Sequence, residues 1–175
     1  MICSMINENP NILIVGTGWA TKSFTNTINK DKYNIKIVSN SDNFIYTPQL
    51  ANFSVTHDVK YLEIDMTNIP KIEFIKDTIK DVDFDKQILI TEKDKIKYDY
   101  VIFAHGAQIN TFNIPGVKEN CLFLKTKKDA DLIYKNLELL EPNAKVAVIG
   151  CGLTGSELIG CLLDKKKFII TAIDG

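Results

Sequence analysis

The sequence predicts an α/β fold in which short buried parallel strands alternate with helices. Residues 11–16, NILIVG, and residues 145–150, KVAVIG, are apolar runs that end at a glycine, as strands buried on both faces do. Each run is followed by a stretch that can form a helix and then by another apolar stretch. This order makes a βαβ unit of about 30 residues, and it occurs twice in the chain.

The composition is that of a globular protein. Hydrophobic residues make up 45% and charged residues 25% of the 175 residues, with a net charge of -1. We therefore expect no nucleic-acid partner. All 21 basic residues are lysines, which disfavours bidentate recognition of phosphate by arginine. No apolar run reaches the roughly 20 residues of a membrane span, so no transmembrane segment is expected.

The cysteines and histidines indicate neither a metal site nor a disulfide framework. Cys3, Cys121, Cys151 and Cys161 form no C-x-x-C pair, and His57 and His105 are the only histidines. The first ten residues, MICSMINENP, show neither a signal-peptide core nor the pattern of a transit peptide. A cytoplasmic location with free thiols is the expectation.

The elements follow in order along the chain. We expect strands at 11–16, 36–39, 72–75, 86–91, 98–106, 145–150 and 167–175, with a polar turn region at 80–86. Helices are expected at 19–29 and 126–140, and a third helix should follow the second glycine run and end at about residue 164. Residues 41–58 have no steady period and are interpreted as a long functional loop. Pro142 ends the last long helix before the second glycine run. The predicted domains are therefore residues 1–142 and an incomplete unit at 143–175.

The second glycine run carries a G-x-G-x-x-G motif at Gly150, Gly152 and Gly155. The strand before it and the helix after it would place a pyrophosphate at the helix N-terminus. Asp174 ends the next strand, where a carboxylate accepts hydrogen bonds from a ribose 2′-hydroxyl and favours NAD over NADP. The alternative is that these glycines only serve a tight turn between strand and helix.

The first glycine run departs from that motif. It reads Gly16, Gly18 and then Thr21, whose side chain we expect to crowd the contact between helix and strand. Ser39 ends the following strand where an acid is usual, and its hydroxyl can still bind a ribose. Trp19 is either part of this site or a core aromatic. Further along, Ala104 and Gly106 end a buried strand with small residues, which lets a cofactor approach the backbone.

Together these stretches resemble the type II (alternative) NADH dehydrogenases, which are two-dinucleotide flavoproteins. The resemblance lies in VGTGWATKSF, NFIYTPQL, VIFAHGAQINTFNIPGVKENCLFLKTKKDA and VAVIGCGLTGSELIG, and it covers the chain from about residue 11. It implies a Rossmann-like FAD-binding domain with a parallel sheet and a small β-meander. It also implies the first β-α-β of a second Rossmann unit, which would bind NADH.

The resemblance also assigns residues to the cofactors. Those implied for FAD are Gly16, Gly18, Trp19, Ala20, Ser39, Thr47, Pro48, Ala104 and Gly106, with Thr47 and Pro48 beside the isoalloxazine. Those implied for NADH are Gly150, Gly152, Gly155, Glu157 and Asp174. Taken without the resemblance, Thr47 and Pro48 belong to an ordinary turn. The departures are Thr21, Gln49 and His105, and His105 is interpreted as a loop residue without a catalytic role.

The implied activity is transfer of a hydride from NADH to FAD and of electrons onward to quinone. No catalytic residue of the protein itself is assigned. Similar proteins are longer, and the quinone site falls in the part that this sequence lacks. We therefore expect a truncated form, whose partner is either a separately encoded C-terminal half or a second copy bound through the exposed tail. The alternatives are a non-catalytic remnant and a nucleotide-binding or interaction module.

Overall fold

The computed structural model describes residues 9–175, which form two compact units. The first unit consists of the residues up to Phe44 and Ile64–Ala107, and the second of Ile45–Glu63 and Gln108–Gly175. The chain passes from one unit to the other at β3 (Asn43–Ile45), at β4 (Glu63–Asp65) and between Ala107 and Gln108. Strands β3 and β4 pair in a two-stranded sheet. Each unit is considered on its own.

The first unit is built on a parallel sheet with the strand order β5-β2-β1-β9. Its strands are β1 (Asn11–Val15), β2 (Asn34–Ser39), β5 (Ile72–Lys76) and β9 (Tyr100–Phe103). The connection from β1 to β2 is α1 (Trp19–Thr27). This arrangement confirms the predicted α/β fold and the first βαβ unit.

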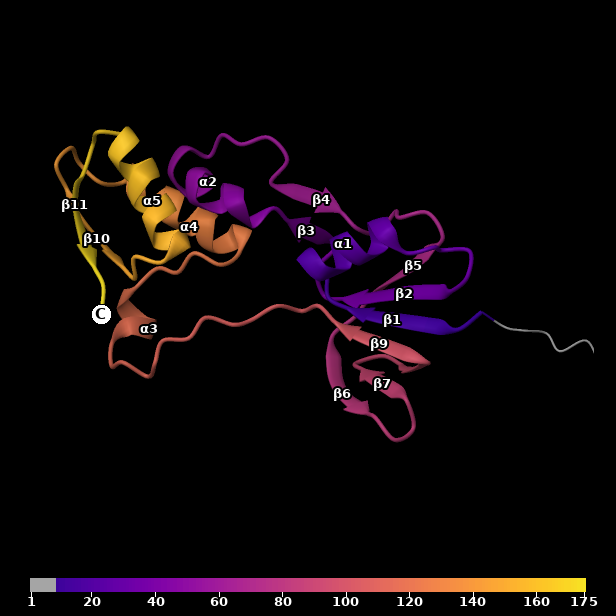
Figure 1. The fold of residues 1–175 in the computed structure, drawn as a ribbon. Coiled ribbons are helices and arrows are strands. Elements are labelled where there is room, and N and C mark those ends of the chain that lie inside the picture. The colour runs from indigo at the N-terminus through magenta and orange to yellow at the C-terminus, as the bar shows by residue number, and fades with distance from the viewer. Residues whose placement is uncertain (1–8) are drawn as a thin grey trace, which may run out of the picture. The chain divides into compact units, whose positions relative to one another are not determined.

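Alternating side chains of β1 and β2 build two cores, one on each face of the sheet. Helix α1 covers one face of this sheet (Figure 1). On that face, Ile14 and Ile37 pack with Phe44 and Met66. On the other face, Leu13 and Val38 pack with Leu89 of a three-stranded antiparallel sheet. Its strands are β6 (Ile79–Asp83), β7 (Ile88–Thr91) and β8 (Lys95–Lys97), which is the predicted β-meander.

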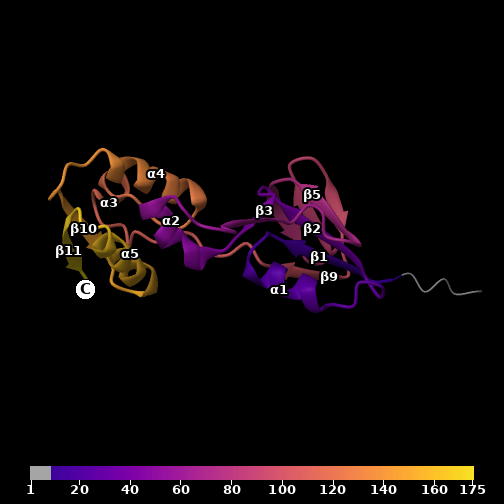
Figure 2. The ribbon, with the colours of Figure 1, turned by 90° about the horizontal axis from the view of Figure 1, so that it is seen from above.

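The second unit combines helices with a two-stranded parallel sheet. Its elements are η1 (Thr47–Gln49), α2 (Leu50–Thr56), α3 (Val117–Asn120), α4 (Lys127–Glu138), β10 (Lys145–Ile149), α5 (Leu153–Asp164) and β11 (Ile169–Ile173). Val55 of α2, Ile133 and Leu137 of α4, Val148 of β10 and Leu162 of α5 form one core. Figure 2 shows α2 and α4 on the same side of this unit, with the β10–β11 pair next to α5.

Three parts of the first two-thirds of the chain differ from the prediction. The expected loop at 41–58 contains β3, η1 and α2. The polar stretch around residue 81 forms strand β6 and not a turn, because Ile79 and Val82 pack against the core of the meander. Strands β4 and β8 are too short for a visible pattern. No helix in residues 9–175 has the length and apolarity to cross a bilayer.

The second βαβ unit, β10-α5-β11, is also present as predicted. It does not stand apart, because Val148 and Leu162 lie in one core with side chains of α2 and α4. The compact units therefore do not coincide with the predicted domains 1–142 and 143–175. The predicted division into an FAD-binding part, 1–142, and an NADH-binding part, 143–175, stays a prediction.

Candidate functional site

The first glycine turn brings together the carboxyl ends of three strands. Gly16 follows β1 with a φ of +96°, and its N–H donates to the carbonyl of Val38 in β2 at 2.8 Å. A Cβ atom on Gly16 or on Gly18 would lie 2.8 Å from the carbonyl oxygen of Ala104, at the end of β9. Both glycines are therefore required by the backbone that surrounds them, and ligands of open α/β sheets bind at this edge.

The helix that leaves this turn has an N-terminus without a side-chain cap. Gly18 is the N-cap residue of α1, and Trp19 and Ala20 form the first positions of the helix. Helix α4, in contrast, is closed by a capping box of Thr126 and Asp129. The first N–H groups of an α-helix lack intrahelical partners and carry its positive dipole end, so α1 offers an anion site. This fits a pyrophosphate.

Trp19 stands at the border of that site. Its side chain packs edge-on against Phe44, with ring centroids 4.9 Å apart and an angle of 89° between the rings. It nevertheless keeps 49% of its surface exposed. Trp19 thus packs on Phe44 of the core and keeps about half of its surface exposed beside the helix N-terminus.

Thr21 does not crowd the turn, contrary to the expectation from the sequence. Its side chain is fully buried, and its hydroxyl donates a hydrogen bond of 2.7 Å to the carbonyl of Gly16. The residue that departs from the glycine motif is therefore part of the turn's own hydrogen bonding.

Ser39 and the end of β9 complete this edge. The Ser39 side chain is buried, and its oxygen accepts a hydrogen bond of 3.1 Å from the N–H of Ser41. Ala104 is buried against the glycine turn, whereas Gly106 has a φ of +76° and open space around it. His105 lies between them with an exposed ring edge-on to Phe103. Gly16, Gly18, Ser39 and Ala104 thus lie at one edge of the sheet.

A hollow of about 220 Å³ opens at the same edge of the sheet, beyond β2 and β5. We call it the β2–β5 hollow, and its lining residues are Asn40, Lys76, Asp77, Thr78, Glu92 and Lys93. Asp77 is only 6% exposed. The Thr91 hydroxyl, with backbone N–H groups of Thr78 and Lys93, lowers the pKa of this carboxyl below its usual value. Asp77 was not among the residues predicted from the sequence, although an acid directly after an apolar strand was an available signal.

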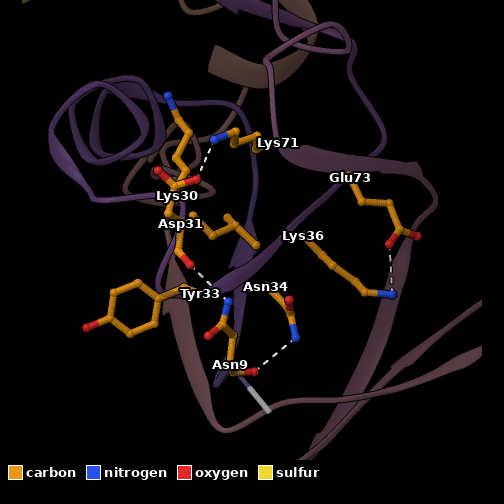
Figure 3. A pocket seen from close by; sticks show the side chains of 9 residues that line it. Asn9, Lys30, Asp31, Tyr33, Asn34, Lys36, Lys71 and Glu73 are labelled. Carbon is orange, nitrogen blue, oxygen red and sulfur yellow. Dashed lines mark hydrogen bonds and ion pairs between the residues drawn. The ribbon is translucent and has the colours of Figure 1, made fainter. Parts of the chain in front are cut away.

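A larger hollow, of about 410 Å³, lies at the amino ends of β1, β2 and β5. Two ion pairs line it, Lys36 with Glu73 and Lys71 with Asp31, as Figure 3 shows. Asn34 donates from its side chain to the carbonyl of Asn9 at 2.9 Å. Ligands of such sheets bind at the opposite, carboxyl edge, so this hollow is not a candidate for the site.

The second glycine turn, in the second unit, has the same local form. Gly150 has a φ of +89°, and its N–H donates to the carbonyl of Ile173 at 2.8 Å. A Cβ on Gly155 would lie 1.8 Å from the oxygen of Gly150, so only glycine fits there. Asp174 accepts a hydrogen bond of 3.0 Å from the N–H of Cys151. The structure therefore places the Asp174 carboxylate at the glycine turn.

The remaining residues of this turn are exposed. Gly152 is the N-cap of α5 and has no side-chain cap, and Glu157 lies on the solvent side of that helix. A Cβ on Gly150 or Gly152 would meet no atom within 4 Å, unlike the equivalent atoms at Gly16 and Gly18. Thr47 and Pro48 form the exposed start of η1, also in the second unit.

The comparisons with known proteins agree with this geometry. Residues 10–174 match the model of the pyridine nucleotide-disulphide oxidoreductases. The chain belongs to this family of two-dinucleotide oxidoreductases. Within it, the resemblance to type II NADH dehydrogenases is confirmed by relatives that are named NAD(P)H-ubiquinone oxidoreductases.

One such relative is the external alternative NAD(P)H-ubiquinone oxidoreductase B2 of Arabidopsis thaliana. It is 31% identical to this chain over 87% of the chain's residues, which correspond to 31% of the plant protein. The structure of NDH2 from Plasmodium falciparum in complex with NADH is 27% identical, with a TM-score of 0.75 over 89% of this chain and 37% of that one. A ferredoxin reductase from Rhodopseudomonas palustris, at 21% identity, shares the fold with a TM-score of 0.79 over 94% of this chain and 42% of its own. The chain thus spans about a third of the length of the Arabidopsis relative.

Proposed function

We propose that the first unit binds FAD at the edge formed by the ends of β1, β2 and β9. The observation that carries this proposal is the Gly16–Gly18 turn, which is closed by backbone on one side and leads into an uncapped helix on the other. Gly16, Gly18, Trp19 and Ala20 would hold the pyrophosphate. The Ser39 hydroxyl would bind the adenosine ribose, and Ala104 and Gly106 would let the cofactor approach the backbone of β9.

The second glycine turn would bind NADH through Gly150, Gly152 and Gly155. Asp174 lies at this turn, where its negative charge would repel a 2′-phosphate and favour NADH over NADPH. Thr47 and Pro48 would contact the isoalloxazine, and Glu157 would lie near the nicotinamide. When bound, the flavin supplies the hydride and electron chemistry, and the protein binds and orients the two nucleotides.

We propose NADH:quinone oxidoreduction as the reaction that the nucleotide-binding residues of this chain serve. The support is the family membership and the naming of the relatives. Because the chain spans a third of such a relative, we expect the 175 residues alone to show no turnover with NADH and a soluble quinone analogue. Steady-state NADH oxidation at about 1–1,000 per second, the range of ordinary enzymes, would contradict this.

FAD binding can be tested directly because Trp19 is the only tryptophan and borders the proposed pyrophosphate site. Titration with FAD should quench Trp19 fluorescence and give the purified protein a flavin spectrum. His105→Ala should bind FAD as the parent does, since the ring lies outside the turn. Absence of both signals at saturating FAD would refute the proposed function.

A second function, as an interaction module, is favoured by the second unit's sheet. In the described residues β10 pairs only with β11, and the outward side chains Ile149, Ile169 and Ile173 are 64%, 50% and 48% exposed. Such apolar strands recruit other chains. The partner would be a second copy or a separately encoded C-terminal half.

Light scattering of the purified chain distinguishes the two partners. Self-association that Ile149→Lys abolishes would identify a second copy. Leu139→Lys is the matched control, because Leu139 is 83% exposed and is the C-cap residue of α4, outside both strands. A monomer at all concentrations would leave the separate half as the partner. The cytoplasmic location expected from the sequence stays part of this proposal.

A further inference from the structure

Helices α2 and α5 each start beside residues to which the proposed function assigns a nucleotide. Thr47 and Pro48 form the start of η1, which runs directly into α2 at Leu50. Gly152 of the second glycine turn is the N-cap residue of α5. All these elements belong to the second unit, in which α2 packs against α5 (Figure 1). The position of α5 along α2 therefore decides how far these two groups of residues lie from each other.

One side chain joins the opposite ends of these helices. Lys165 is the C-cap residue of α5, and its ammonium group donates a hydrogen bond of 2.8 Å to the carbonyl of Val55. Val55 is the next-to-last residue of α2, so its carbonyl lacks an intrahelical donor. The same ammonium group pairs with Glu138 of α4 at 2.8 Å and lies 5.5 Å from the centre of the Tyr134 ring. Lys165 thus links α5 to both α2 and α4.

This link is directional, whereas the apolar core beside it is not. Val55 and Leu162 pack in the core that α2, α4, β10 and α5 share. Burial of apolar surface is non-directional, so it holds α5 against α2 without fixing the position of α5 along the helix axis. A hydrogen bond weakens steeply when its geometry is disturbed, and polar contacts in packed interfaces serve to fix register. Because the length of an α-helix is set by its residue number, a helix fixed at its carboxyl end is also fixed at its amino end.

We propose that Lys165 is a positioning residue that sets the distance between the second glycine turn and the segment of Thr47 and Pro48. The inference rests on the proposed function, which assigns NADH to the turn and the isoalloxazine to that segment. Lys165 acts through α2 and α5, without contact to either nucleotide. Its side chain is 29% exposed, and its removal leaves the Val55 carbonyl and the Glu138 carboxylate without this donor.

Spin labels measure this distance without any ligand. They are attached through Thr47→Cys and Leu153→Cys, at two exposed positions, in the full chain with its native cysteines replaced by alanine. The parent should give one narrow distance distribution. Lys165→Met keeps the apolar stem of the side chain but has no donor, and it should broaden or shift the distribution. Lys165→Arg should restore the narrow distribution, and Lys166→Met, at the exposed next position, is the control and should match the parent.

Two ligands then separate positioning from a loss of structure. ADP-ribose contains the part that the second glycine turn is proposed to hold, whereas NADH also carries the nicotinamide, which has to meet the isoalloxazine. In the chain loaded with FAD, Lys165→Met should weaken NADH binding about tenfold and leave the affinity for ADP-ribose unchanged. Equal weakening of both ligands would show a structural role only and would overturn the proposal.

The outcomes separate this inference from the proposed function. If the parent binds no FAD, the proposed function fails, and the label distances still decide the role of Lys165. If Lys165→Met leaves the distance distribution unchanged, the positioning role is refuted, whichever nucleotides bind. Should Lys165→Met not fold, Lys165→Gln takes its place, because its amide keeps a donor on a shorter side chain. A distribution for Lys165→Gln equal to the parent's would then refute the role.

Discussion

The hydroxyl of Thr21 donates a hydrogen bond of 2.7 Å to the carbonyl oxygen of Gly16, inside the first glycine turn. At the equivalent position of the second turn a Cβ on Gly155 would lie 1.8 Å from the oxygen of Gly150. The two turns therefore share a sequence pattern but differ in width at this position. The first holds a side chain, and the second holds only glycine.

Removing that hydroxyl tests its contribution to the first unit. Thr21→Val keeps the shape of the side chain and leaves the Gly16 carbonyl without this donor. We expect a loss of about 1–3 kcal/mol in the free energy of unfolding, the cost of an unsatisfied buried polar group. Denaturant unfolding measures it. Thr27→Val in the same helix is the control, because its hydroxyl is exposed and should matter little. Equal effects of both changes would contradict this account.

Gly18 and Gly152 occupy equivalent places in the two motifs and should respond differently to valine. A Cβ on Gly18 would meet the Ala104 oxygen at 2.8 Å. Gly18→Val should therefore lower the free energy of unfolding by about 1–3 kcal/mol through overpacking, and it should also abolish FAD binding. Gly152 has no atom within 4 Å of that position, so Gly152→Val should leave thermal stability near the parent's. Melting curves of both variants check this. A stable Gly18→Val that still binds FAD would mean the first motif is only a turn.

The tail after residue 142 should be needed for the second unit to fold. Leu162 is 2% exposed in the core with Val55 and Ile133, while its neighbour Leu163 is 58% exposed. Leu162→Ala should cost about 2–5 kcal/mol, the range for a buried leucine. Leu163→Ala should change stability by less than about 0.5 kcal/mol, as surface changes do. Hydrogen exchange of the α2 amides measures the effect, because these amides should lose protection when the core is weakened. A deletion of the tail that leaves this protection unchanged would refute the shared core.

Acid should weaken the attachment of α5 to α4. The Lys165 ammonium, 2.8 Å from Glu138, holds the pKa of that carboxyl below its ordinary value of 4.5. A lowered folded pKa gives stability that is present above pH 4.5 and is lost as the pH falls through the lowered value. Glu138→Gln should therefore be less stable than the parent at pH 7 and equal to it in strong acid. Chemical denaturation of both proteins from pH 7 to strong acid tests whether their free energies of unfolding become equal. Glu141 is exposed, so Glu141→Gln is a control whose stability should follow the parent's at every pH.

The parts of the fold that the sequence predicted are those fixed by local chemistry. The glycine turns follow from local backbone demands, which are the positive φ of Gly16 and the closeness of Gly155 to the oxygen of Gly150. Helix α2 could not be found in this way, because its Phe53, Ser54 and Val55 are weak helix formers. It is stabilised by burial against residues of α4 and α5 that follow far along the chain.

The same distinction holds for the site. Ser39 and Ala104 were named from the sequence because each stands at the end of a recognisable apolar strand, and Gly18 because it belongs to the glycine motif. The hydrogen-bond partners of Asp77 come from separate segments, at Thr78 and Lys93, so its burial is visible only in the folded unit. The expected crowding by Thr21 was wrong, because the motif does not give the width of the turn.

The two compact units are interleaved along the chain, and this sets an order for their synthesis. Each unit contains a stretch that interrupts the other, since Ile45–Glu63 belongs to the second unit and lies between the two parts of the first. On the ribosome the first unit is complete once Ala107 has emerged, whereas α2 must wait for α4 and α5. During that interval the apolar side chains of α2, Leu50, Phe53 and Val55, remain uncovered on the nascent chain.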